Sequence, residues 1–294
     1  MTTVVGESRV VRPTSVDEAV SELARNRGRA KIVAGCTDLT LALRRSEERP
    51  DVFITVAGIP EIRTIREDSR GIRIGAAVTM TELEDAPAIV QRYTALAEAA
   101  RTVGGVQIRN AATLGGNVCN ASPGADTPPA LLALGAVAEI AGAGGRRRVD
   151  IEEFFLGPRR TVLEPSEMLV AFHMPRPPAR FGSAYLRLTP REALDLAIVG
   201  VAVGIGLDTH RIVAACRIAL GAVAPTPLLV PEAGARLLGQ VVDTEQLAEA
   251  GSVAAAACRP IDDVRASAAY RREVVPILVR RAITMALARA AADL

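Results

Sequence analysis

The chain has 294 residues, with 35 basic and 33 acidic side chains and only 3% aromatic residues. Its length predicts two domains, and a formal net charge of +2 excludes a global field that would attract nucleic acid or an anionic membrane. The four cysteines and two histidines lie far apart, which excludes a closely spaced metal or iron–sulfur site, so demanding chemistry would need a cofactor.

The start of the chain shows no charged leader followed by an apolar run, and arginines interrupt the apolar segment 274–294. We therefore expect a cytoplasmic protein without a membrane span.

Residues 15–57 are predicted to form an αβαβ unit. Ser15 and Glu18 form a capping-box pattern ahead of apolar residues at helical spacing, which predicts a helix over 16–26. Apolar runs at 30–34 and 51–56 predict short buried strands. A turn at 35–38 opens a second helix from Leu39 to Arg45.

The pattern then changes. Residues 62–77 suggest a hairpin, Thr79 to Glu82 is another capping box, and an Ala-rich helix is expected over 94–102. The stretch 103–129 contains five glycines and little periodicity, and a structureless run of that length is usually functional or wrongly assigned. A helix over 130–138 and a hairpin around 142–145 follow.

A Pro-rich segment, 174–180, is the best candidate for a domain boundary. Beyond it, strict alternation over 199–207 predicts a half-buried strand, which a turn joins to a second strand at 212–220. Two helical stretches follow residue 227, and a long helix begins near Tyr270. The second part is therefore α+β, with antiparallel strands.

Two glycine turns have the composition of a phosphate site. The first spans 32–38, and the second spans 112–117 and is followed by the polar segment 119–126. Glycine lets backbone N–H groups approach a pyrophosphate, and a turn that opens a helix also offers unpaired N–H groups. Neither turn matches the G-x-G-x-x-G or P-loop pattern. Each alone could equally be a tight strand-to-helix connection, but two in one domain favour phosphate binding.

These turns carry a family resemblance. Residues 32–39, 106–118 and 122–126 resemble the flavin-binding medium subunit of the molybdenum hydroxylases, which include xanthine dehydrogenase and carbon monoxide dehydrogenase. The resemblance extends over nearly the whole chain. It includes the opening segment 12–19, the segment 219–227, and the arginine pairs that follow Tyr270 and precede Ala282.

The resemblance implies an α+β fold. An FAD-binding domain of the vanillyl-alcohol-oxidase (PCMH) type would span 1–176 in two αβ subdomains, about 1–57 and 58–176. A small α/β C-terminal domain with an antiparallel sheet, like that of the carbon monoxide dehydrogenase flavoprotein, would span 177–294.

It also implies a set of FAD-binding residues. Asp126 would contact the adenosine side, Leu169 would pack near the flavin, and Arg187 would lie near the isoalloxazine. The first clasp of the pyrophosphate would be formed by Ile32, Val33, Ala34, Gly35, Cys36, Thr37, Asp38 and Leu39, and the second by Thr113, Gly115, Gly116 and Asn117.

Two positions depart from the family pattern. Cys36 replaces a common glycine, so the first turn must accept a Cβ there, and Val103 stands where xanthine dehydrogenases have an aromatic residue near the flavin. The first turn has no histidine, so FAD should be bound non-covalently.

Other conspicuous residues have simpler explanations. We favour packing over a redox role for Cys119, because free cysteines are commonly buried. His173 is expected to be structural and His210 solvent-facing. The arginines 146–148 are interpreted as a solvated turn rather than a contact with a partner chain. Thr37 and Asp38 could cap the following helix and contact phosphate at the same time.

The resulting hypothesis is the FAD subunit of a multi-subunit molybdenum hydroxylase. Molybdopterin would sit on a large partner chain and [2Fe–2S] clusters on a small one, as a dimer of heterotrimers. FAD would pass electrons to NAD, oxygen or another acceptor. A self-sufficient flavin oxidase with its own substrate pocket is the alternative, and a scaffold with empty glycine turns is a third.

Overall fold

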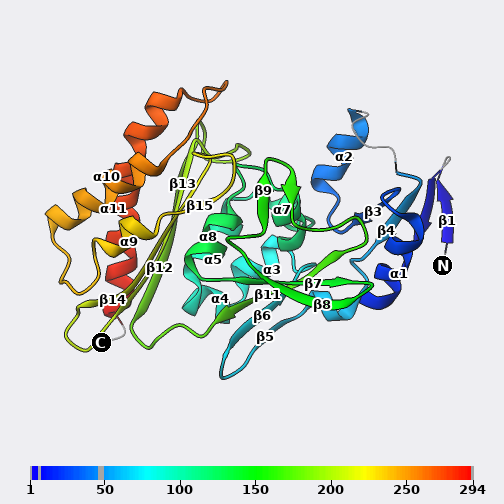
Figure 1. The fold of residues 1–294 in the computed structure, drawn as a ribbon, viewed down its shortest axis with the longest axis horizontal. Coiled ribbons are helices and arrows are strands. Elements are labelled where there is room, and N and C mark those ends of the chain that lie inside the picture. Colours follow the sequence, from blue (N-terminus) through cyan, green and yellow to red (C-terminus); the bar gives the residue numbers. More distant parts are fainter. Residues whose placement is uncertain (1, 6–7, 46–49, 293–294) are drawn as a thin grey trace.

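The computed structural model describes residues 2–5, 8–45 and 50–292. Three larger sheets follow one another along the long axis of the molecule, and the two ends of the chain lie at opposite ends of it (Figure 1). The mixture of helices and sheets is the predicted α+β fold.

The N-terminal subdomain is a four-stranded sheet in the order β1 (Thr2–Val5), β2 (Ser8–Val11), β4 (Val52–Thr55) and β3 (Ala30–Val33). Strands β2 and β3 both run parallel to β4. Helix α1 (Val16–Asn26) begins at the predicted capping residue Ser15, and α2 (Thr37–Arg44) begins two residues earlier than predicted. The αβαβ prediction is confirmed.

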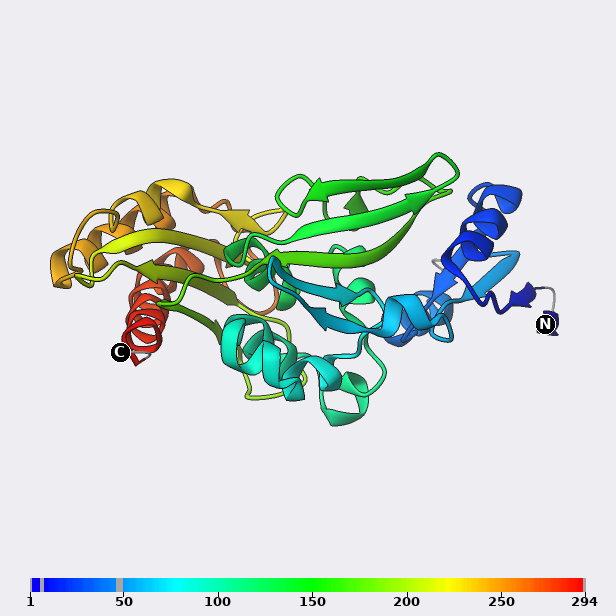
Figure 2. The same cartoon turned by 90° about the horizontal axis from the view of Figure 1, so that it is seen from below.

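The central subdomain is an antiparallel sheet in the order β5 (Ile65–Glu67), β6 (Gly71–Gly75), β11 (Met168–Pro175), β7 (Val137–Gly142) and β8 (Gly145–Asp150). Ile62 lies in a short 3-10 helix, η1 (Pro60–Arg63), so the hairpin is shorter than predicted. Helices α3 (Met80–Asp85), α4 (Pro87–Arg92) and α5 (Thr94–Thr102) lie together on one side of this sheet (Figure 2). The small pair β9 (Phe155–Gly157) and β10 (Arg160–Thr161) lies beside it.

The weak periodicity of the Gly-rich stretch 103–129 suggested a run without regular structure, but the stretch contains helices. It forms α6 (Val106–Arg109), α7 (Leu114–Cys119) and the start of α8 (Thr127–Ala133), which are too short to show a helical pattern in the sequence. The helix predicted over 130–138 therefore begins earlier and ends earlier. Gly135, at φ 64°, ends it and lets the chain turn into β7.

The C-terminal domain has the antiparallel sheet β12 (Phe181–Leu188), β13 (Val199–Leu207), β14 (Val213–Gly221) and β15 (Leu228–Leu229). Helices α9 (Pro231–Ala235) and α10 (Thr244–Ala257) follow, and α11 (Ala268–Ala292) covers β12 and β13.

Strand β13 is buried along its whole length, whereas its alternation predicted a half-buried strand. The positions between its branched apolar residues are small rather than polar, such as Gly200 and Gly204. A Cβ at Gly204 would lie 2.8 Å from the Ala133 carbonyl oxygen at the end of α8. The second face is therefore covered by the central subdomain, which a sequence pattern does not reveal.

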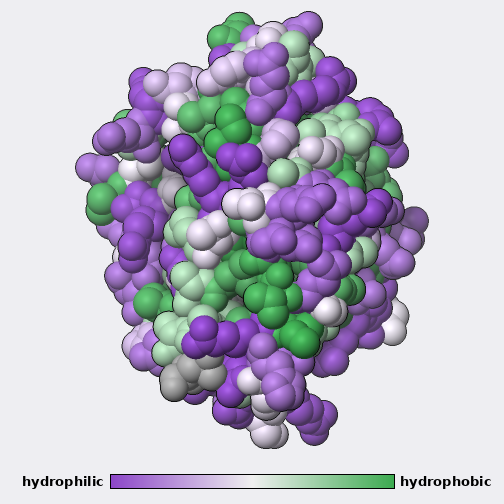
Figure 3. Space-filling model, turned by 90° about the vertical axis from the view of Figure 1, so that its left-hand side faces the viewer, coloured by the Kyte–Doolittle hydropathy of each residue, from purple (hydrophilic) through white to green (hydrophobic). Residues whose placement is uncertain are grey.

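The two predicted domains share a core, because Tyr185, Ala202 and Ala219 of the C-terminal sheet pack with the apolar cluster of the central subdomain. Strand β11 ends at Pro175 and β12 starts at Phe181, on either side of the predicted boundary at 176/177. Within the described ranges no helix is long and apolar enough to cross a membrane. Figure 3 views the molecule from the side of its C-terminal domain, where apolar patches are surrounded by hydrophilic surface.

Candidate functional site

The two glycine turns meet in the structure. A Cβ at Gly35 would lie 1.9 Å from the Ala111 carbonyl oxygen and 2.6 Å from its carbonyl carbon. Only glycine allows the N-terminal subdomain to approach the segment that leads into the second turn this closely. The tertiary fold therefore brings together two turns that are about 75 residues apart in the sequence, as a shared phosphate site requires.

The first turn exposes the start of α2. Cys36 precedes this helix at φ 61°, in the left-handed region, and its side chain makes no capping hydrogen bond. The first N–H groups of a helix need acceptors from outside the helix. With the partial positive charge of the helix N-terminus, they suit a pyrophosphate.

Asp38 lies in the first turn of α2. Desolvation by the surrounding protein raises the pKa of this carboxyl group, and the positive charge of Arg159 opposes the shift. Arg159 belongs to the turn between β9 and β10, and its backbone N–H donates to the Ala121 carbonyl oxygen at 2.9 Å. The β9–β10 turn thus brings a basic side chain close to Asp38, while its backbone contacts Ala121, which follows the second glycine turn.

In the second turn, side chains are better placed than backbone N–H groups to bind a ligand. The Leu114 and Gly115 N–H groups already donate to carbonyl oxygens of Val78 and Ala76, at 2.9 and 2.8 Å. The Gly116 N–H group donates to the Thr113 hydroxyl oxygen at 3.1 Å. The idea that backbone amides of both turns hold the phosphates therefore applies best to the first turn.

Asn117 supplies the clearest donor of the second turn. Its Oδ1 accepts a hydrogen bond from the fully buried Thr127 hydroxyl at 2.6 Å. With Oδ1 held in this way, the amide NH₂ group points away from Thr127 and can donate to a ligand. The side-chain amide is thus oriented by the start of α8.

Asp126 and Arg187 form a buried ion pair. The Asp126 carboxylate is 3.0 Å from Nη1 of Arg187 and accepts a second hydrogen bond, of 2.7 Å, from the Tyr185 hydroxyl. Burial raises the pKa of Asp126, whereas Arg187, Tyr185 and the Thr102 hydroxyl oppose the shift. Burial and the negative charge of Asp126 together raise the pKa of Tyr185, so its hydroxyl stays protonated and donates.

This pairing bears on the two roles that the resemblance assigned. Asp126 was expected at the adenosine end of FAD and Arg187 at the isoalloxazine end, yet their side chains touch. The two ends of an extended dinucleotide lie much further apart than a hydrogen bond. Both roles therefore cannot hold for an extended FAD.

Val103 and Leu169 both pack in the apolar core of the central subdomain. Val103 directly follows Thr102, which lies beside Asp126, and it packs against the core of the central subdomain. Leu169, on β11, is buried in the same core. In the first turn, Ile32 and Val33 belong to β3, Ala34 and Gly35 connect it to α2, and Thr37 and Leu39 lie in the first turn of that helix.

The simpler explanations hold for Cys119, His173 and His210, but not for the arginines at 146–148, which lie in β8 rather than in a turn, nor for helix capping by Thr37 and Asp38, because the N-cap of α2 is Cys36. Cys119 packs against the central core, and burial raises the pKa of its thiol to about 12, so it is not a thiolate. His173 bonds Glu139 at 2.6 Å within the sheet, and His210 is exposed. Arg146 is not simply solvated, because it pairs with Glu139 at 2.6 Å.

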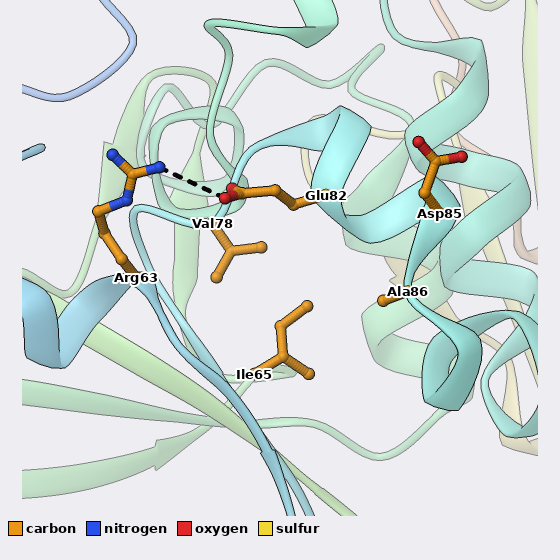
Figure 4. A pocket seen from close by; sticks show the side chains of 6 residues that line it. All are labelled: Arg63, Ile65, Val78, Glu82, Asp85 and Ala86. Atoms are coloured by element: carbon orange, nitrogen blue, oxygen red, sulfur yellow. Dashed lines mark hydrogen bonds and ion pairs between the residues drawn. The ribbon is translucent and has the colours of Figure 1, made fainter.

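A separate pocket of about 340 Å³ lies between η1, β5 and α3 (Figure 4). Arg63 points across it toward Glu82, with which it forms an ion pair of 3.3 Å. Its lining shares no residue with the glycine turns, so it is not part of the candidate site. Among the described residues, no group of three or more His, Cys, Asp or Glu side chains could hold a metal ion.

Two residues of the site, Tyr185 and Thr127, were not singled out from the sequence. Tyr185 and Arg187 alternate on β12 and so share one face, which period-two spacing could have indicated. Thr127 carried no signal beyond its place at a helix start. Its burial and its bond to Asn117 depend on the tertiary fold.

Comparison with known proteins identifies the family. The profile described as the FAD binding domain in molybdopterin dehydrogenase matches residues 6–177, and that of the CO dehydrogenase flavoprotein C-terminal domain matches residues 184–286.

Full-length relatives have similar sequences. The carbon monoxide dehydrogenase medium chain of Hydrogenophaga pseudoflava is 36% identical over 95% of this chain and 96% of its own. The xanthine dehydrogenase FAD-binding subunit of Escherichia coli O157:H7 is 34% identical over 96% of this chain and 97% of its own.

Solved structures agree. A chain of carbon monoxide dehydrogenase from Hydrogenophaga pseudoflava superposes with a TM-score of 0.92 at 35% identity, covering 98% of this chain and 99% of that one. A chain of quinoline 2-oxidoreductase from Pseudomonas putida 86 gives 0.90 at 28% identity, with 98% and 99% covered. The chain belongs to the family of FAD-binding medium subunits of the molybdenum hydroxylases, the oxidoreductases of the carbon monoxide dehydrogenase and xanthine dehydrogenase type.

Proposed function

We propose that this chain carries electrons through a non-covalently bound FAD within a multi-subunit molybdenum hydroxylase. The electrons would come from [2Fe–2S] clusters on a small partner chain and would leave to an external acceptor such as NAD or oxygen. Molybdopterin would sit on a large partner chain. The cytoplasm is the expected location, and a dimer of heterotrimers is the expected assembly.

The observation that carries this proposal is the meeting of the two glycine turns at Gly35 and Ala111. It sets the uncapped start of α2 close to the segment that carries Thr113 and Asn117. A pyrophosphate held there would accept hydrogen bonds from the first amides of α2 and from the Asn117 side-chain amide.

When bound, FAD would supply the two-electron redox chemistry that this chain's side chains lack. The protein residues would bind and orient it. Because Asp126 touches Arg187 and lies beside Thr102, we place all three at the isoalloxazine end, together with Val103 and Leu169. This replaces the adenosine-side role first assigned to Asp126.

Two measurements test the proposal. The purified protein, with any chains that copurify with it, should show the flavin absorption bands, and a colourless protein that takes up no added FAD would overturn it. Expression together with the neighbouring reading frames should recover a large and a small chain. Substrate turnover by the isolated chain would instead favour a self-sufficient flavin oxidase.

A further inference from the structure

The segment between the second glycine turn and α8 is held by the C-terminal domain. We call residues 121–127 the connecting loop. The Ala222 N–H group, at the end of β14, donates to the Pro123 carbonyl oxygen at 2.8 Å. At the other end of the loop, Asp126 is bonded by Tyr185 and Arg187 of β12. The C-terminal domain thus contacts both ends of the loop.

Arg271 supports the first of these contacts, the one made by Ala222. It lies on α11 with only 3% of its surface exposed. Its guanidinium donates from Nη1 to the carbonyl oxygens of Ile198 and Ala222, at 2.6 and 2.9 Å, and from Nη2 to Asp263 at 2.7 Å. Ala222 itself is in the left-handed region at φ 63°, a conformation that needs outside support.

The position of the connecting loop determines how a side chain of the second glycine turn is oriented. Thr127 directly follows Asp126, and its hydroxyl holds Oδ1 of Asn117 at 2.6 Å. An unbroken series of hydrogen bonds and adjacent residues therefore runs from the C-terminal domain through the connecting loop to Asn117. No atom of Tyr185 or Arg271 needs to touch the ligand for these residues to affect its binding.

We propose that Tyr185 and Arg271 are positioning residues for the cofactor, and that the C-terminal domain orients Asn117 and Asp126 through the connecting loop. This inference rests on the proposed function, because it assumes that the ligand at Asn117 is FAD. On this inference, FAD affinity depends on residues of the C-terminal domain as well as on the two glycine turns.

Tyr93 provides a matched control. Like Tyr185 it is buried, with 1% against 3% exposed, and its hydroxyl makes one hydrogen bond between distant segments, to the Pro175 carbonyl oxygen at 3.1 Å. That acceptor lies outside the connecting loop. The variants Tyr185→Phe and Tyr93→Phe each remove one hydroxyl from a buried site, and both should lower thermal stability, Tyr185→Phe the more because its hydroxyl bonds a carboxylate.

The experiment compares FAD affinity in the wild type and these two variants. The full chain, with any subunits that copurify, is stripped of flavin and titrated with FAD while flavin fluorescence and the visible spectrum are followed. Tyr185→Phe should raise the dissociation constant about tenfold, the equivalent of one hydrogen bond to a charged group. It should also shift the flavin absorption bands. Tyr93→Phe should stay within about twofold of the wild type, with an unchanged spectrum.

Two further variants keep the test decisive if Tyr185→Phe fails to fold. Thr127→Val removes the hydroxyl that holds Asn117 while keeping the shape of the side chain, and Arg271→Lys removes the paired bonds to Ile198 and Ala222. Both should weaken FAD binding more than Tyr93→Phe does. Equal affinities in all variants would overturn the inference and leave the proposed function intact. A wild type that takes up no FAD would overturn both.

Discussion

The carboxylate of Asp126 and the guanidinium of Arg187 lie 3.0 Å apart in the interior, with 7% and 6% of their side chains exposed. One belongs to the FAD-binding domain and the other to the C-terminal domain. An ion pair this deeply buried stabilises the folded state only when both partners are present, since each charge alone would be desolvated without compensation. The pair therefore ties the docking of the two domains to the candidate cofactor site.

Replacing only one partner should be costly. We expect Arg187→Met to lower the free energy of unfolding by about 3–5 kcal/mol, because it leaves the Asp126 carboxylate buried without a counter-charge. Urea unfolding at neutral pH measures this. The double variant Asp126→Asn with Arg187→Met should recover part of the loss, and a double variant no more stable than Arg187→Met would contradict the interpretation.

The left-handed conformation of Cys36 predicts a stabilising substitution. A side chain at φ 61° costs about 1–2 kcal/mol, of which the extra freedom of glycine in the unfolded chain would cancel about half. Cys36→Gly should therefore raise the free energy of unfolding by about 0.5–1 kcal/mol. Denaturant titration measures the change.

Gly28 offers the reverse variant, because it has φ 80° and nothing within 4 Å of an added Cβ. Gly28→Ala should destabilise the chain by a similar amount. A neutral or destabilising Cys36→Gly beside a destabilising Gly28→Ala would show that the Cys36 side chain contributes contacts that outweigh the backbone strain.

The adjacent glycines of the second turn should respond differently to a bulky residue. A Cβ at Gly116 would meet only the Thr113 hydroxyl oxygen, at 2.9 Å, whereas one at Gly115 would meet both the side chain and the backbone of Ala76 at 2.7 Å. Gly116→Val should therefore abolish FAD retention while the thermal unfolding transition persists. Gly115→Val should disrupt the central subdomain itself.

Flavin absorbance per chain and circular dichroism separate the two effects. Normal flavin content in folded Gly116→Val would mean that the backbone at Gly116 is not in contact with the cofactor.

Lowering the pH should reduce the free energy of unfolding through Glu139, which lies on β7 of the central sheet. Burial works to raise the pKa of this carboxyl group, but hydrogen bonds from His173 and Arg146 outweigh it and lower the pKa below its usual 4.5. The folded state therefore binds fewer protons here than the unfolded state. The stabilisation is complete above the unfolded pKa and is lost as the pH falls through the folded one.

We expect the dependence of unfolding free energy on pH, between about pH 5 and pH 3, to be shallower in Glu139→Gln than in the wild type. Urea unfolding across that range measures it. Glu153→Gln, at an exposed position in the same subdomain, serves as the control. Identical pH profiles for Glu139→Gln and the wild type would exclude this group from the acid response.

Much of the secondary structure could be predicted because its determinants are local. The helix over 16–26 follows from a capping box and an amphipathic spacing, and the strand over 199–207 from period-two alternation. Both have the predicted bounds. The short helices α6 and α7 could not be predicted in this way, since four to six residues are too few to show a helical period.

The sequence also identified the composition of the candidate site. Glycines without side chains, a helix start, and Thr and Asn donors are local properties of the two turns, and they sufficed to predict a bound phosphate and, by resemblance, FAD.

The tertiary structure alone decided which of these groups act together. It packed Gly35 on Ala111, used the amides of the second turn for internal hydrogen bonds, and buried Asp126 against Tyr185 and Arg187. Such contacts join residues far apart in the chain, so local propensity and periodicity carry no information about them. Whether a donor is free to bind a ligand depends on what the rest of the fold has already bonded to it.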